Sequence, residues 1–96
     1  MSPTERISGA SVKSTTNQAV EGNSVNLTCE AAGSVFSRQW KKDGSDLILT
    51  NNMTLNREES VLSFQSLKRT NSGKYSCRIT NPINSVEAEY NMVVNC

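Results

Sequence analysis

The chain has 96 residues, which suits one small domain with a modest hydrophobic core. Ten basic and nine acidic residues give a net charge of +1, without the basic stripe that binding to nucleic acid or an anionic membrane requires. The absence of histidine removes the usual general base at neutral pH and the commonest metal ligand. We therefore expect no enzyme activity, no cofactor, no metal site and no nucleic-acid partner.

The first residues show no strand pattern. Residues 1–8 are mostly polar, and we expect them to be a flexible leader that precedes a single domain over residues 9–95. The sequence has neither a signal peptide nor a run of 18 apolar residues, so we expect no direct insertion of this segment into a membrane. We expect the chain to be a fragment of a larger protein.

Alternation of apolar and polar residues predicts a series of short strands. The first is expected over residues 10–15. In the second, Val25, Leu27 and Cys29 alternate with polar residues such as Asn26. This pattern is typical of a half-buried strand whose apolar side faces inward.

The next strand is expected over residues 36–42. It has Trp40 on one face and Gln39 and Lys41 on the other, because successive side chains point to opposite sides of a strand. The dipeptide Asp43-Gly44 follows, and both of its positions tolerate positive φ. A tight hairpin is therefore predicted at this point.

The middle of the chain predicts shorter strands. Residues 47–49 are expected to form a short strand after the hairpin, and residues 53–56 a brief edge strand. A core strand with Leu62 and Phe64 on its inner face follows, and residues 68–73 are a polar crossover.

The last part of the chain repeats the alternating pattern. Tyr75, Cys77 and Ile79 share one face, and a final strand is expected over residues 86–94. Turn signals recur about every ten residues, and no segment has the period of a helix. The sequence therefore predicts an all-β sandwich.

Four motifs together resemble the C2/I-type domains of cell-surface proteins of the immunoglobulin superfamily. Cys29 and Cys77 lie 48 positions apart, Trp40 lies between them, and Tyr75 precedes the second cysteine by two residues. The motifs occupy residues 21–29, 40–44, 62–64 and 72–77. Residues 79–85 also resemble the corresponding loop of carcinoembryonic-antigen-type and hepatocyte-type adhesion molecules.

The resemblance implies an immunoglobulin-like Greek-key sandwich of two antiparallel sheets, bridged by a disulfide between Cys29 and Cys77. About 20 residues separate Gly44 from Phe64, which leaves room for one or two short strands and indicates a C2 or intermediate type rather than a variable domain. The expected core comprises Trp40, Tyr75, Leu27, Leu62 and Phe64.

In function, the resemblance implies an extracellular module of a plasma-membrane adhesion molecule. Such a module binds the same or a related cell-surface protein, or serves as a spacer. One alternative is the ligand-binding domain of an immune receptor, with loops such as residues 81–85 as its binding site. Another is an intracellular structural module of muscle type, in which a bridging cystine and glycans would be unexpected.

Two sequons for N-glycosylation are present, Asn26-Leu27-Thr28 and Asn52-Met53-Thr54. Asn26 is expected to point outward because Leu27 and Cys29 point inward, and Asn52 lies in an expected loop. Exposed asparagines in a secreted chain are acceptors for glycans. We therefore expect glycans at both Asn26 and Asn52.

The partner-binding face is expected on the third, sixth and seventh strands. Two interpretations of its charges remain open. In the first, Arg78 forms ordinary cross-strand pairs with Glu87 or Glu89. In the second, the charges form a self-complementary mosaic that supports a weak homodimer. The predicted face comprises Gln39, Lys41, Arg78, Glu87 and Glu89.

Two residues depart from the family pattern. Asn71 stands where the family usually has an aspartate that pairs with an arginine one strand away, so that ion pair cannot form. Cys96 has no partner in the pattern. It is interpreted as a boundary residue before a following segment, an intermolecular disulfide or a reactive thiol.

Overall fold

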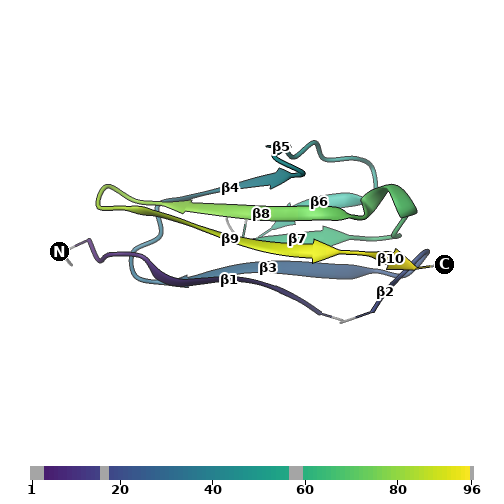
Figure 1. Cartoon of the computed structure of the whole chain (residues 1–96), viewed down its shortest axis with the longest axis horizontal. Coiled ribbons are helices and arrows are strands. Elements are labelled where there is room, and N and C mark those ends of the chain that lie inside the picture. Colours follow the sequence, from purple (N-terminus) through teal and green to yellow (C-terminus); the bar gives the residue numbers. More distant parts are fainter. Residues whose placement is uncertain (1–3, 16–17, 57–59, 96) are drawn as a thin grey trace.

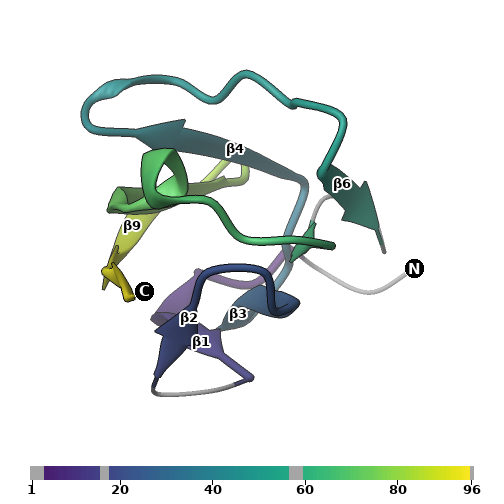
Figure 2. The same ribbon diagram turned by 90° about the vertical axis from the view of Figure 1, so that its right-hand side faces the viewer.

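The computed structural model describes residues 4–15, 18–56 and 60–95. In these residues two four-stranded antiparallel sheets pack as two layers, which confirms the expected all-β sandwich (Figures 1 and 2). The first sheet has the order β1-β3-β7-β6, with bounds β1 Ser8–Ser14, β3 Val25–Ala32, β7 Val61–Phe64 and β6 Met53–Asn56. The second has the order β5-β4-β8-β9, with bounds β5 Ser45–Asp46, β4 Ser37–Lys42, β8 Gly73–Thr80 and β9 Ser85–Met92.

A short parallel pair of strands joins the layers near the C-terminus. It consists of β2 (Ala19–Val20) and β10 (Val94–Asn95), so the expected strand over residues 86–94 is divided between β9 and β10. The last residues leave the second sheet because they pair with β2. The described part is elongated, with extents of 48 × 22 × 20 Å, and its first and last described residues lie at opposite ends of the long axis (Figure 1).

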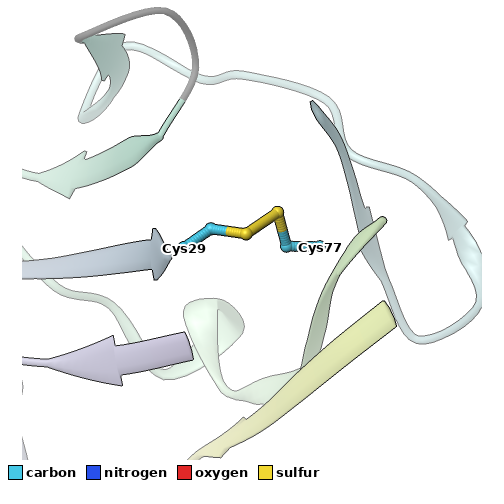
Figure 3. The surroundings of a disulfide bond; sticks show 2 residues. All are labelled: Cys29 and Cys77. Atoms are coloured by element: carbon cyan, nitrogen blue, oxygen red, sulfur yellow. A yellow bond between two sulfur atoms is a disulfide. The ribbon is translucent and has the colours of Figure 1, made fainter. Parts of the chain in front are cut away.

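The core lies between the two sheets, where the inward residues of the alternating strands meet. A disulfide joins Cys29 of β3 to Cys77 of β8, with their Cα atoms 6.4 Å apart, and thus links the layers covalently (Figure 3). Trp40 lies directly opposite Cys77 in the β4–β8 register and belongs to the same buried cluster. Leu27, Leu62, Phe64 and Tyr75 are also buried in this cluster.

Tyr75 fastens the polar crossover to the core. Its hydroxyl donates a hydrogen bond of 2.5 Å to the carbonyl oxygen of Asn71, at the end of the 3₁₀ turn η1 (Arg69–Asn71). Its ring meets Phe64 edge to face, with the centroids 5.7 Å apart. Burial raises the pKa of Tyr75, and the nearby carboxylate of Asp43 raises it further.

Replacing Tyr75 by phenylalanine is expected to lower the free energy of unfolding by about 1–3 kcal/mol, because the Asn71 carbonyl loses a buried donor. The variant should also be less sensitive to alkali. The native pKa of Tyr75 is raised, so its stabilising effect is fully present below the unfolded pKa of about 10 and is lost as the pH rises above it. Urea unfolding at neutral pH and at about pH 10.5 measures both effects. An equal alkaline loss in both proteins would contradict the second.

The hairpin between β4 and β5 forms at Asp43 and Gly44, which have φ values of 52° and 84°. The strand expected over residues 47–49 is wrong, because β5 comprises Ser45–Asp46 and the following residues cross toward β6 in the other sheet. Ile48 in this crossing is 79% exposed. Leu47 still donates a backbone hydrogen bond of 3.3 Å to the Trp40 carbonyl, but Ile48 and Leu49 are exposed and form no strand, so hydrophobicity alone does not make one.

The folded region begins before the expected boundary at residue 9. Ile7 is buried and Ser8 begins β1, so the last part of the expected leader belongs to the domain. The backbone N–H of Ile7 donates to Asn84 Oδ1, and Asn84 Nδ2 donates to the Ile7 carbonyl, both at 3.0 Å. Hydrogen bonds between residues 77 positions apart produce this order, so a local pattern does not reveal it. Cys96 lies outside the described residues.

Candidate interaction face

The outer face of the second sheet has rows of polar side chains that the strand register sets side by side. In one row, Gln39 of β4 lies opposite Arg78 of β8, which lies opposite Glu87 of β9. In the next row the order is Lys41, Ser76 and Glu89. Basic residues therefore lie on β4 and β8 and acidic residues on β9, so that the face changes from basic to acidic across the strands.

The described contacts on this face differ from the expected cross-strand pairs. Glu89 pairs diagonally with Lys74, at 3.1 Å between Oε2 and Nζ. Both side chains are about half exposed, so this pair contributes less than about 1 kcal/mol to stability. Arg78 donates through Nη2 to the hydroxyl oxygen of Ser85 at 3.4 Å and is exposed, facing Glu87 across the strands.

Two features of the face were not visible in the sequence. Asp46 lies beside Lys41 in the register of the β4–β5 hairpin and accepts a hydrogen bond of 3.2 Å from Gln39 Nε2. Asp46 therefore adds an acidic group at the β5 edge. Ser76 has outward parity but is only 9% exposed, so the larger neighbouring side chains cover it.

The apolar content of the face is small. Val93, which follows β9, is 67% exposed. Buried aromatic anchors carry much of the energy in tight protein interfaces, and the rows of this face contain none among the described residues. A contact made through these rows is therefore expected to be weak and governed by charge.

The two sequon asparagines occupy different environments. Asn26 is exposed on β3, on the outer side of the first sheet. Asn52 is half-buried, and its side-chain nitrogen donates to the Ser66 carbonyl at 2.7 Å and to Asn71 Oδ1 at 3.1 Å. Asn52 therefore donates a side-chain hydrogen bond to residue 71, where the family pattern has an aspartate in an ion pair.

A second polar cluster, centred on Asn81, lies beside the N-terminal segment and links it to two loops by hydrogen bonds. Asn81 Nδ2 donates to the carbonyl oxygens of Glu5 and Ser34, at 2.7 and 2.8 Å. Its Oδ1 accepts from the backbone N–H groups of Ile83 and Asn84. One buried amide thus holds together the N-terminal segment, the β3–β4 loop and the β8–β9 loop.

The described residues contain no group of three or more His, Cys, Asp and Glu side chains that could hold a metal ion. Among these same residues, no helix has the length and apolar character needed to cross a membrane.

A family model for the immunoglobulin domain matches residues 7–81 of the sequence. Together with the two-layer sandwich, this match shows that the chain belongs to the immunoglobulin domain family. Relatives of the chain in sequence include cell adhesion molecules.

Cell adhesion molecule 2 of Xenopus tropicalis is 38% identical over 77 residues, which cover 78% of this chain and 17% of the relative. The adhesion molecule CEACAM5 of Mus musculus is 36% identical over 63 residues, which cover 66% of this chain and 7% of the relative. The chain therefore spans less than a fifth of the length of these relatives.

Solved structures give the same assignment. Murine CEACAM1b superimposes with a TM-score of 0.81 at 29% identity, over 92% of this chain and 45% of that protein. The titin M3 domain has a TM-score of 0.73 at 21% identity, over 88% of this chain and 99% of that domain. At this identity, the likeness to the muscle protein shows a shared fold alone.

Proposed function

We propose that this domain is an extracellular module of a cell adhesion molecule and that it binds protein through the outer face of β4, β8 and β9. The similarity to cell adhesion molecule 2 and CEACAM5 supports the class of protein. The disulfide supports an oxidising compartment, because such bonds persist in secreted and cell-surface proteins. The plasma membrane is the corresponding location, with this domain on its outer side.

The observation that carries the choice of face is the register that sets Arg78 opposite Glu87. Consider a two-fold axis that lies in front of this face, parallel to the strands and midway between β8 and β9. Such an axis places β9 of a second copy over β8 of the first, and β8 of the second copy over β9 of the first. Arg78 of one copy then meets Glu87 of the other, and the pair forms twice. The partner we propose is therefore a second copy of this domain or a related domain with the same charge order.

The likeness to a known receptor supports a protein partner. A solved complex of a mouse coronavirus receptor-binding domain with its murine receptor matches this chain with a TM-score of 0.82 at 28% identity. A domain of this fold thus occurs in a protein that another protein recognises. The chemistry of the face in this chain favours a charged and polar partner surface over an apolar one.

Reversing the charge of residue 78 with Arg78→Glu is expected to abolish self-association, because each copy would then present glutamate to Glu87 of its partner. The melting temperature should stay nearly unchanged, since exposed charges contribute little to stability. Sedimentation velocity over a range of protein concentrations, at low and high salt, measures the association.

A charge swap gives the decisive control. Arg78→Glu combined with Glu87→Arg restores opposite charges across the proposed axis, so self-association should return. Lys13→Glu changes the net charge of the protein by the same amount, but Lys13 is exposed on β1 in the other sheet and should have no effect. If the double variant stays monomeric, or if Lys13→Glu weakens association as much as Arg78→Glu, the proposed face is wrong.

A further inference from the structure

We propose that Asn26 carries the N-linked glycan of the folded domain, whereas Asn52 is a structural residue that stays unmodified. The sequence alone gives the two sequons equal standing. The structure separates them, because one side chain is exposed on a strand and the other is enclosed in a hydrogen-bonded network. The proposal rests on the extracellular location proposed above.

Both N–H groups of the Asn52 side chain are engaged in hydrogen bonds. Its two N–H groups have two acceptors, the Ser66 carbonyl at 2.7 Å and Asn71 Oδ1 at 3.1 Å. Its Oδ1 accepts from the Thr50 hydroxyl. The backbone is engaged as well, because the Asn52 carbonyl accepts from the N–H of Gln65 at 2.8 Å.

The network continues into the core through Asn71. Asn71 is 7% exposed, and its Oδ1 also accepts from the backbone N–H of Lys68 at 2.8 Å. Its carbonyl is the acceptor for the Tyr75 hydroxyl. Asn52 thus links the segment before β6 to the same turn that accepts the hydrogen bond from Tyr75, and it does so through an uncharged pair of amides.

Glycosylation is incompatible with this network. In the transfer from an oligosaccharide pyrophosphate donor, Nδ2 bonds to the anomeric carbon and the bond from that carbon to the phosphate oxygen breaks. The pyrophosphate leaves with the bonding electrons, and the amide loses one proton. The product keeps one N–H group, so it cannot donate to both Ser66 and Asn71. A chain modified at Asn52 before folding loses one of the two bonds that join this segment to Ser66 and Asn71, and such chains should be lost from the secreted fraction.

Asn26 meets the opposite conditions. It is exposed between the buried residues Val25 and Leu27, and lies opposite Ser63 of β7 on the outer side of the first sheet. A glycan at this position projects away from the second sheet. It therefore leaves the face of β4, β8 and β9 uncovered.

The test uses the domain secreted from a glycosylating host behind a fused signal sequence, followed by peptide mapping of both asparagines. We expect a glycan on Asn26 and none on Asn52. Asn26→Gln should lose one glycan mass, and Thr54→Ala, which deletes the second sequon but leaves Asn52 in place, should leave the attached glycan mass unchanged. A glycan on Asn52 of secreted, disulfide-bonded protein, or no glycan on Asn26, would overturn the proposal.

A stability comparison keeps the structural half of the proposal testable on its own. Asn52→Ala and Thr54→Ala both delete the second sequon, but Thr54 is exposed and only the first change breaks the network. Asn52→Ala should raise the unfolding equilibrium constant about tenfold relative to Thr54→Ala. Equal stability of the two variants would contradict a structural role. Because the fused signal imposes secretion, these results do not depend on whether the domain self-associates.

Discussion

Replacing Cys29 and Cys77 together by alanine is expected to lower the free energy of unfolding by about 4 kcal/mol. The disulfide closes a loop of 48 residues. In the chain-entropy model its removal increases the conformational entropy of the unfolded chain, and this gain stabilises the unfolded state by that amount. A domain of this size has a total stability of about 5–10 kcal/mol, so the variant should be barely folded at body temperature. Urea unfolding followed by Trp40 fluorescence measures the change.

The reference for this experiment carries Cys96→Ser, as does the variant, so that no remaining thiol forms mixed disulfides. Reducing agent should then destabilise the reference protein by a similar amount and leave the alanine variant unchanged. A loss of stability below about 1 kcal/mol would show that the link between β3 and β8 is dispensable.

Leu62→Ala is expected to lower the free energy of unfolding by about 2–5 kcal/mol. Leu62 of β7 is completely buried, and its side chain lies between the sheets among Leu27 and Phe64. Truncation removes apolar contacts and leaves a cavity that the surrounding strands cannot close, because the disulfide holds the two layers together. Thermal and urea unfolding of the purified variant measure the loss.

Leu49→Ala is the matched control, because it is the same chemical change at a side chain that is 46% exposed. It should cost much less, about 0.5 kcal/mol or below. Similar losses in the two variants would mean that the side chain of Leu49 packs into the core. This outcome would contradict the position of residues 47–49 outside the sheets.

On the candidate face, strand periodicity predicts which side of the sheet a residue lies on but not which residues form pairs. The side on which Gln39, Arg78 and Glu87 lie follows from alternation, because side chains on a strand have a period of two. The pairing of Lys74 with Glu89 does not follow from it, since several long charged side chains are within reach of each other and their geometry decides between them. For the same reason Asp46 was missed. Its place on the face depends on where the second strand of the hairpin lies. The apolar residues 47–49 led to a strand being expected there, whereas the strand comprises Ser45–Asp46.

The sequence by itself determined the sandwich and its subtype. The spacing of Cys29, Trp40 and Cys77, the position of Tyr75 and the alternating strands are local or pairwise patterns, and each is tied directly to the fold. The dipeptide Asp43-Gly44 likewise determined its hairpin, because positive φ is a property of single residues.

Only the tertiary structure decided which asparagines are structural. Asn52, Asn71 and Asn81 have the same side chain, yet the first links a loop to a turn, the second anchors that turn, and the third joins segments up to 76 positions apart. An amide side chain donates and accepts with little preference for any partner, so its role depends on which backbone groups the folded loops bring within about 3 Å. These backbone groups belong to loops that are distant in sequence and meet only in the folded chain, so the residues next to an asparagine do not predict its partners.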